Sequence, residues 1–311
     1  MSIRHFQNPD FSLRQLQYAV AVAETGGFGA AATLCGVSQP SLSTQVAKLE
    51  SVLGSKLFLR GGKGVLLSPA GERLIPVFRE ALNAAAAVEV AAATLLDPYA
   101  IPLRVAVIPT VAPYLLPLCT RALLAKAGPS VHWLELQTAT AEEALADGKA
   151  DAIIIADPPT ASSLHVEVLG WEPFVVAVPR GTPGPDEVPI TWLQAQQVLL
   201  LEQGHCLRDQ TLSFCGLPQG QRSPFRATSL GTLVQLIAAG FGVGVLPEMA
   251  VAVEAGRADM EVRPFGDERV GRTLRLVSAQ DHPMAPVIAE MAATLRQAMR
   301  SAVPRGFVEH P

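Results

Sequence analysis

Apolar side chains recur at helical spacing near the start of the chain. The stretch "LRQLQYAVAVAETG" carries them every three or four positions, and Gly26-Gly27 ends it. The next stretch, "GAAATLCGVSQPSLSTQVAKLESVLG", predicts helix, turn and helix, with Ser38 as the cap of the second helix. "KLFLRGGKGVLL" alternates around a Gly-Gly-Lys-Gly turn and predicts a hairpin. Together these patterns predict a winged helix-turn-helix over residues 1–67.

Two further regions follow. Ser68-Pro69 begins an alanine-rich helix to about Leu96, in which Pro76 predicts a kink, and we assign residues 68–98 to a linker or dimerisation helix. From Leu103 onward, buried-strand patterns ("LRVAVI", "HWLELQT", "DAIIIA", "VVAVP", "VLLLE") alternate with helical stretches such as "AEEALADGKA" and "LGTLVQLIAAG". This alternation predicts an α/β domain over residues 99–311, with a largely parallel sheet covered by helices. We expect two lobes, lobe I at about 99–174 and 281–303 and lobe II at about 175–280.

Length and charge limit the number of domains and the class of protein. A chain of 311 residues exceeds the usual limit for one hydrophobic core. The net charge is −4, but residues 1–70 hold six basic and three acidic residues, so a mildly basic head precedes an acidic body. The start lacks the apolar segment of a secretory signal, and no apolar run approaches the length of a membrane span. We therefore expect a cytoplasmic protein without membrane contact.

Small polar residues at the start of the predicted second helix favour DNA recognition over a plain three-helix core. The early residues of such a helix read base edges in the major groove, and the wing contacts the backbone. Gln39 and Gln45 suit adenine edges, and Pro40 suits a thymine methyl group. A small positive charge implies few phosphate contacts, so we expect assembly into dimers or larger oligomers. The candidate DNA contacts are Ser38, Gln39, Pro40, Ser41, Ser43, Thr44, Gln45 and Lys48 of the helix, and Arg60 and Lys63 of the wing.

The segment "GHCLRDQTLSFC" holds two of the four cysteines, Cys206 and Cys215. His205, Arg208 and the start of a helix favour a Cys206 thiolate, with Asp209 placed to orient the arginine. A thiolate of low pKa is what peroxide oxidises to sulfenic acid. In a continuous helix the two Cα atoms lie roughly 13.5 Å apart by rise, whereas a disulfide needs about 5.5 to 6 Å, so a bridge requires local unfolding.

Other interpretations of the cysteines remain open. Two incidental cysteines in a mobile loop would carry no function. Zinc ligation is disfavoured because CxxC spacing is missing, and we expect no metal and no cofactor. Cys35 and Cys119 occupy apolar helical positions and are interpreted as core residues.

The stretch "FGAAATLCGVSQPSLSTQVAKLESVLGSKLFLRGGKGVLLSPAG" resembles the amino-terminal domain of LysR-type transcriptional regulators, and "SLGTLVQLIAAGFGVGVLP" fits the family's second lobe. The resemblance implies a dimerising linker helix and a two-lobed regulatory domain similar to periplasmic binding proteins. "GHCLRDQTLSFC" followed by "FRATSLGTL", together with "VIPTVAPYLLP", is similar to the hydrogen-peroxide sensors of this family.

That second similarity implies a set of roles. Cys206 would be the peroxidatic and Cys215 the resolving cysteine of a redox-sensing regulatory domain. It further implies a homodimer or homotetramer on double-stranded promoter DNA, recruitment of RNA polymerase, activation of oxidative-stress defence genes, and re-reduction by glutaredoxin or thioredoxin. The residues matched to the peroxide pocket are Thr110, Thr138, His205, Arg208 and Asp209.

The resemblance has one departure, in the strand "RTLRLVSAQ". Familiar members carry an arginine near the cysteine pocket, and alignment places Ala279 there, with Arg272 and Arg275 as the nearest basic residues. Either the register shifts or the pocket has less positive charge.

Three other functions compete with peroxide sensing. A LysR-type regulator could bind a small carboxylate between its lobes, with Thr110 as a ligand. A thiol-dependent peroxidase would not need the winged helix, so we expect no enzyme, and a periplasmic solute receptor would need a signal peptide.

Overall fold

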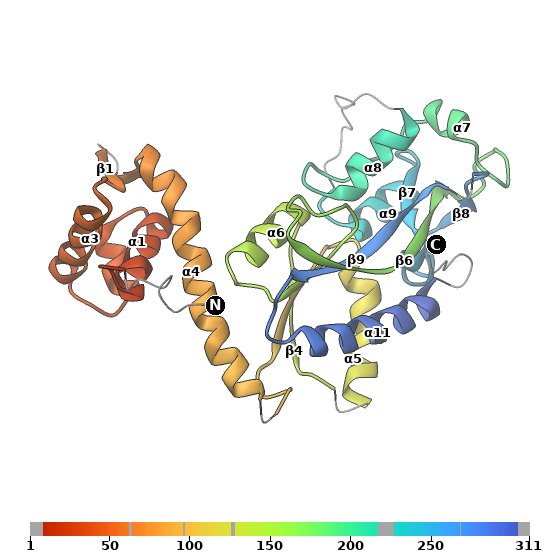
Figure 1. Ribbon diagram of the computed structural model, residues 1–311. Coiled ribbons are helices and arrows are strands. Elements are labelled where there is room, and N and C mark those ends of the chain that lie inside the picture. Colours follow the sequence, from red (N-terminus) through yellow and green to blue (C-terminus); the bar gives the residue numbers. More distant parts are fainter. Residues whose placement is uncertain are drawn as a thin grey trace. The chain divides into compact units, whose positions relative to one another are not determined.

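The computed structural model describes residues 9–61, 64–95, 97–125, 128–216, 227–267 and 269–303 (Figure 1). The chain forms two compact units, Met1–Ala92 and Ala93–Pro311. The boundary between them falls inside the region assigned to the linker helix. The finer domain and lobe bounds given above stay predictions.

The first unit is a winged helix-turn-helix, as predicted. Ser12 caps its first helix: the Ser12 hydroxyl accepts the Gln15 N–H, and the Gln15 carboxamide oxygen accepts the Ser12 N–H at 2.8 Å. Ser38 caps the third helix by accepting the Ser41 N–H. The elements are α1 (Leu13–Thr25), α2 (Phe28–Leu34), α3 (Gln39–Leu53), β1 (Phe58–Gly61), β2 (Gly64–Leu67) and α4 (Pro69–Thr94).

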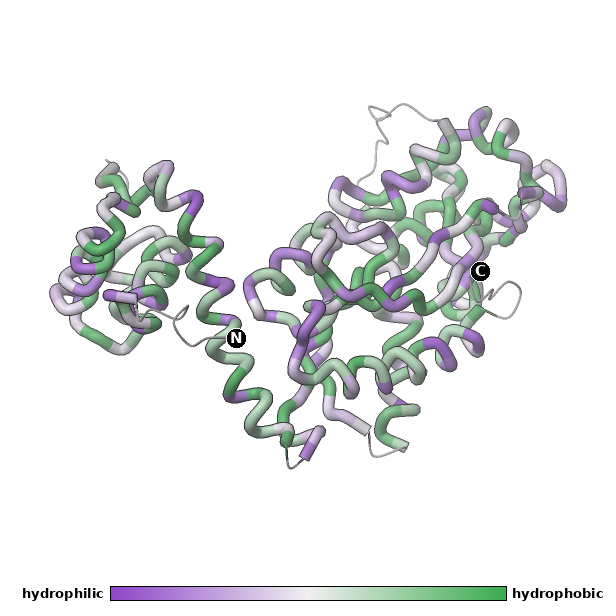
Figure 2. The backbone as a smooth tube through the Cα atoms, in the orientation of Figure 1, coloured by the Kyte–Doolittle hydropathy of each residue, from purple (hydrophilic) through white to green (hydrophobic). Residues whose placement is uncertain are grey.

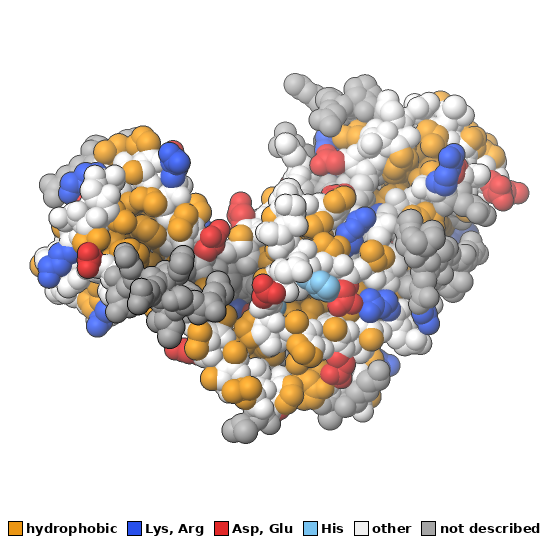
Figure 3. Space-filling model, in the orientation of Figure 1, with side chains coloured by type: hydrophobic (Ala, Val, Ile, Leu, Met, Phe, Trp, Pro, Cys, Tyr) orange, Lys and Arg blue, Asp and Glu red, His pale blue; other side chains and the backbone are white. Residues whose placement is uncertain are grey.

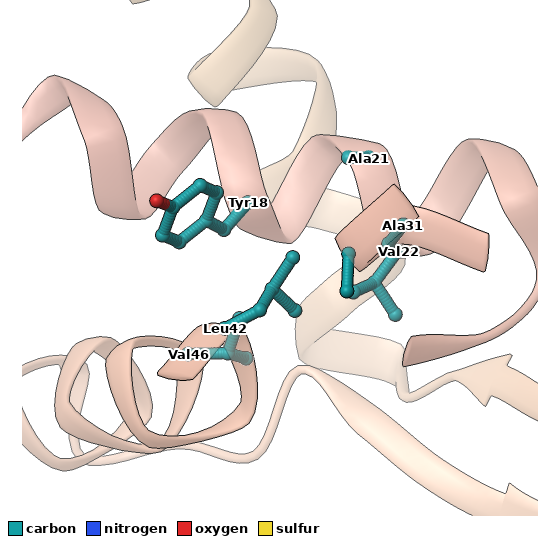
Figure 4. Close-up of a cluster of buried hydrophobic side chains, with 7 residues drawn as sticks. Tyr18, Ala21, Val22, Ala31, Leu42 and Val46 are labelled. Carbon is teal, nitrogen blue, oxygen red and sulfur yellow. The ribbon is translucent and has the colours of Figure 1, made fainter. Parts of the chain in front are cut away.

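Apolar side chains of α1, α2 and α3 form the core of this unit. Figure 4 shows Tyr18 and Val22 of α1 on the same side as Leu42 and Val46 of α3, with Ala31 of α2 beside them. All five are at most 4% exposed. Burial of this apolar surface holds α3 against α1 and leaves the opposite face of α3 to solvent.

Helix α4 is one continuous helix that contains Pro76. The predicted long helix is confirmed, and the kink at Pro76 stays a prediction. Near its start, a Cβ atom on Gly71 would overlap the carbonyl oxygen of Leu57. Glycine is therefore required where α4 packs on the backbone that leads into the wing.

The second unit is built on a mixed seven-stranded sheet of order β4-β3-β5-β9-β6-β7, with β8 also paired to β6. β3 is parallel to β4 and β5, whereas every pairing of β6 and β9 is antiparallel. The prediction of a largely parallel sheet is therefore wrong, because an apolar run does not encode strand direction. The strands are β3 (Leu103–Val107), β4 (Val131–Glu135), β5 (Ala152–Ile155), β6 (Leu164–Pro179), β7 (Gly244–Pro247), β8 (Met260–Pro264) and β9 (Gly271–Ala279).

Strand β6 joins two parts of this sheet. Residues 164–173 pair with β9, and residues 174–179 pair with β7 and β8. The register shifts between Val168 and Gly170, and Gly170 has φ 153°. In Figure 2, hydrophobic stretches run through the interior of this unit, whereas the loop after β6 is largely hydrophilic.

Helices cover the sheet, and those predicted from "AEEALADGKA" and "LGTLVQLIAAG" are confirmed as α6 and α9. The predicted strand "VLLLE" instead forms isolated bridges, from Val198 to Val243 and from Leu201 to Ala227. The helices are α5 (Ala112–Ala125), α6 (Thr138–Ala146), α7 (Ile190–Gln194), α8 (Cys206–Cys215), α9 (Leu230–Ala238), α10 (Glu248–Glu254) and α11 (Ala285–Ala302).

Candidate functional site

The predicted DNA-reading residues lie on the surface of α3, and Figure 3 shows basic side chains on the surface of the same unit. Gln45 is the exception, because it is half-buried and accepts a hydrogen bond from Gln15. The Thr44 hydroxyl donates to the Pro40 carbonyl at 2.8 Å. The exposed members are Ser38, Gln39, Pro40, Ser41, Ser43, Thr44 and Lys48.

The wing contributes less to the described surface. Arg60 lies in β1, where its backbone pairs with Val65. Lys63 lies outside the described residues, and the side chain of Arg60 is likewise outside them. Phosphate contacts by both residues stay predictions.

Cys206 and Cys215 are the first and last residues of α8. Both are free thiols and both are buried, with exposed fractions of 7% and 0%. The predicted helix between the cysteines is therefore confirmed. Gly204, which precedes α8, has φ +100°, and a Cβ atom there would overlap the Gln137 carboxamide. This close approach fixes the start of α8 next to the start of α6.

A buried arginine dominates the electrostatics around Cys206. Arg272 of β9 donates from Nε to Glu172 Oε2 at 2.8 Å, from Nη1 to the Thr110 hydroxyl at 2.7 Å and from Nη2 to the Thr110 carbonyl at 3.2 Å. Glu172 Oε1 also accepts the Met249 N–H at 2.9 Å. Glu172 and Arg272 are 0% and 3% exposed. These contacts fix the direction of the guanidinium.

Two opposing effects act on the Cys206 thiol. Burial raises its pKa, while the positive charge of Arg272 lowers it, opposed in turn by Asp157. The nearby Thr138 hydroxyl and Leu207 N–H also favour the thiolate. The pKa of Cys206 nevertheless stays above its ordinary value, contrary to the expectation of a low-pKa thiol.

Within the described part of the chain, two buried polar atoms near Cys206 have no hydrogen-bond partner. They are Thr138 Oγ1, at the first residue of α6, and His205 Nδ1, at the cap of α8. Burial lowers the pKa of His205, so its imidazole is neutral at pH 7 and supplies no positive charge. Each of these two atoms can take a further hydrogen bond.

The Arg208 guanidinium is directed away from Cys206 and donates to the Leu201 carbonyl at 3.0 Å. Arg208 is two positions from Cys206, and residues two apart on a helix point in different directions. Asp209 is exposed, and its expected role in orienting Arg208 stays a prediction. Gln210, one turn after Cys206, instead faces the same side and donates to Asp157 at 2.7 Å.

Cys215 lies in apolar surroundings. Burial raises the pKa of its thiol to about 12. Neighbouring Phe214 packs between the rings of Phe174 and Phe265, at centroid distances of 5.7 and 5.6 Å. The Cys215 thiol is therefore protonated and inert while α8 is intact.

Comparison with protein families gives two matches. Residues 13–72 match the bacterial regulatory helix-turn-helix protein model of the lysR family. Residues 99–300 match the LysR substrate binding domain. The chain belongs to the LysR family. These matches agree with the winged helix-turn-helix and with the two-lobed regulatory domain expected from the sequence.

Among individual LysR-family proteins, a probable hydrogen peroxide-inducible genes activator of Mycobacterium avium is 39% identical over 84% of this chain and 86% of its own. The DNA-binding transcriptional dual regulator OxyR of Escherichia coli K12 is 35% identical over 93% and 96%. A full-length OxyR variant from Pseudomonas aeruginosa superposes with a TM-score of 0.77 at 31% identity, covering 98% of this chain and 100% of the other. A mutant OxyR of Corynebacterium glutamicum with bound hydrogen peroxide gives 0.64 at 32%, covering 96% and 95%.

Sequence reasoning named Arg272 as one of the two nearest basic residues but gave it no role beside Cys206. It left two explanations for Ala279 at the position where familiar members carry an arginine: a shift in the alignment register, or less positive charge near Cys206. The structure favours the shift in register, since Arg272 acts on Cys206 whereas Ala279 is exposed. Glu172 was missed as well, although a lone glutamate in "GWEPFVVAVP", an otherwise apolar strand, is a signal for a buried charge pair. Thr110, the expected anion ligand, already accepts two hydrogen bonds from Arg272.

Two further properties bear on the site. In the described residues, no group of three or more His, Cys, Asp or Glu side chains is arranged to hold a metal ion. Among the helices described, none is long and apolar enough to cross a membrane.

Proposed function

We propose that this LysR-family protein is a transcription regulator that senses hydrogen peroxide through Cys206 and activates oxidative-stress defence genes. The observation that carries the proposal is the position of the Cys206 thiol beside a fixed guanidinium and two buried polar atoms without partners. Of the relatives compared above, one is named a probable hydrogen peroxide-inducible genes activator and another the DNA-binding transcriptional dual regulator OxyR, which supports the same function.

The first chemical step is oxidation of Cys206. The thiolate attacks one peroxide oxygen, an S–O bond forms and the O–O bond breaks. The leaving hydroxide takes the proton released by the thiol and departs as water, so the products are a sulfenic acid and one water molecule. Thr138 and His205 supply the hydrogen-bonding groups that orient the peroxide, and Arg272 stabilises the negative charge.

The second step is disulfide formation with Cys215. The Cys215 sulfur attacks the Cys206 sulfur, the S–O bond breaks, and the oxygen leaves as a second water molecule. Because the two residues lie at opposite ends of α8, the helix must unfold first. Unfolding one helix changes the surface of the regulatory domain in an all-or-none manner, and this is the signal.

The remaining partners follow from the same proposal. The winged helix binds promoter DNA as part of a homodimer or homotetramer, and the oxidised form recruits RNA polymerase. Glutaredoxin or thioredoxin returns two electrons to the disulfide and resets the sensor. Each protein molecule then reacts once per signal, which distinguishes a sensor from a peroxidase.

The test is thiol mapping after about one equivalent of hydrogen peroxide, with Cys206→Ser and Cys215→Ser as matched variants. We expect a rapid link between Cys206 and Cys215 that is absent from both variants, and peroxide consumption that stops after one turnover. If Cys206 remains a thiol under this treatment, peroxide is not the signal.

A further inference from the structure

One hydrogen bond joins the middle of α8 to a loop elsewhere in the second unit. Gln210 Nε2 donates to Asp157 Oδ1 at 2.7 Å, across 53 positions of sequence. Asp157 follows β5, and both residues are half-buried. A hydrogen bond accepted by a carboxylate is stronger than one between neutral groups. This bond therefore stabilises the helical form of α8.

The same aspartate lies close to the Cys206 thiol. Gln210 is four positions after Cys206, so the two side chains leave the same face of α8, with Cβ atoms about 5 to 6 Å apart. The carboxylate that Gln210 binds is thus one side chain away from the sulfur. Burial raises the pKa of Cys206, Arg272 lowers it, and the negative charge of Asp157 raises it further.

The charges around the thiol come from different elements. Arg272 of β9 and Asp157 of the loop after β5 act on the thiol in opposite directions. A second arginine of β9, Arg275, lies beside Asp157, because it donates at 3.0 Å to the carbonyl of the residue before it. Loss of the Asp157 charge would therefore leave the positive charges unopposed there. The titratable groups that act on these side chains are Arg272, Arg275, Asp157, His205, Glu135 and Glu202.

We propose that Asp157 restrains both steps of the switch and thereby raises the peroxide concentration at which the sensor responds. Its charge opposes the thiolate that attacks peroxide. Its bond to Gln210 holds α8 in the helical form that keeps Cys206 and Cys215 apart. Asp157 acts through other residues, so it is a positioning residue. The inference rests on the proposed peroxide-sensing function.

Two substitutions at this one position separate the two effects. Asp157→Asn and Asp157→Ala both remove the charge. Asparagine can still accept from the Gln210 NH₂ group or donate to the Gln210 oxygen, so a hydrogen bond to α8 remains. Alanine can do neither, so it also releases α8. Asp186→Asn, at an exposed position between β6 and α7, makes the same change in charge and is the control.

The experiment measures three quantities on the full-length reduced protein, each resolved by peptide mass spectrometry. They are the pH–rate profile of Cys206 alkylation by iodoacetamide, the rate of Cys206 oxidation by excess hydrogen peroxide at pH 7, and the rate of the disulfide closure that follows. Circular dichroism checks the fold of each variant.

We expect both Asp157 variants to shift the alkylation profile to lower pH and to oxidise Cys206 at least about threefold faster than the wild type. Asp157→Ala should also close its disulfide about fivefold faster than Asp157→Asn, because it lacks the bond to Gln210. Asp186→Asn should match the wild type in all three measurements.

The inference fails if neither Asp157 variant shifts the alkylation profile to lower pH, if Asp186→Asn shifts it equally, or if Asp157→Asn and Asp157→Ala close at the same rate. Alkylation needs no peroxide, so the profile tests the charge effect by itself. A wild-type Cys206 that does not react with peroxide would overturn the peroxide-sensing function, and the threshold role of Asp157 with it.

Discussion

The stability of α8 should control how fast the sensor closes its disulfide. Nine residue steps separate Cys206 from Cys215, and at about 1.5 Å each they hold the Cα atoms about 13.5 Å apart. A disulfide requires about 4.4 to 6.8 Å. Closure therefore draws on the fraction of molecules in which α8 is open, and a substitution that changes this fraction changes the closing rate in proportion.

A substitution at Ser213 can change the fraction of molecules with an open α8, because Ser213 lies on the exposed side of this helix between the cysteines. Glycine disfavours a helix by about 1 kcal/mol relative to alanine, which is about a fivefold difference in the open population at room temperature. We expect Ser213→Gly to close its disulfide about five times faster than Ser213→Ala, with the wild type between them.

The assay mixes each reduced protein with excess hydrogen peroxide, quenches with acid and an alkylating reagent, and follows both products by mass spectrometry. Excess peroxide makes the first step fast, so that the second becomes visible. The rate of Cys206 oxidation serves as the control and should be the same in all three proteins, because Ser213 is two turns from Cys206. Equal closing rates for the glycine and alanine variants would refute the requirement that α8 opens.

Three other variants test the site and its support. In the first, Arg272→Met is combined with Glu172→Gln so that no buried charge is left unpaired. The double variant should raise the pKa of Cys206 and slow its reaction with peroxide at pH 7 by at least about tenfold. An unchanged pH–rate profile would contradict this. Burial alone would raise the pKa of Asp151, but hydrogen bonds from its histidine and arginine neighbours lower it from 3.8 to about 2. Asp151→Asn should therefore lower the free energy of unfolding, measured with urea at pH 7, by about 2 kcal/mol. The difference between the variant and the wild type should disappear as the pH falls from about 4 to about 2. Gly204→Ala should lower the free energy of unfolding by about 1 to 3 kcal/mol in the same assay.

The sequence predicts best what local patterns encode. The cap at Ser38, the hydrophobic spacing of the first three helices and the helix between Cys206 and Cys215 all depend on neighbouring residues. The winged helix-turn-helix and α8 are confirmed. Strand direction in the second unit depends on chain crossings, which leave no periodic signal, and the prediction of a largely parallel sheet failed.

The chemistry around Cys206 shows the same division. Proximity in sequence favoured His205 and Arg208 as stabilisers of the thiolate, but the first is neutral and the second faces away. The charge comes from Arg272, which is 66 positions away and comes near Cys206 only when β9 pairs with β6. Contacts of this kind follow from the assembled sheet and not from the motif.

The ion pair between Glu172 and Arg272 also constrains how this sequence changes over time. Its members are 100 positions apart in the chain, yet both are buried and bonded to each other. Loss of either one would strand a charge in the interior at a cost of about 3 to 5 kcal/mol, comparable to much of a domain's stability. Single substitutions at either position should therefore be selected against, and a change at one should be tolerated only together with a change at the other.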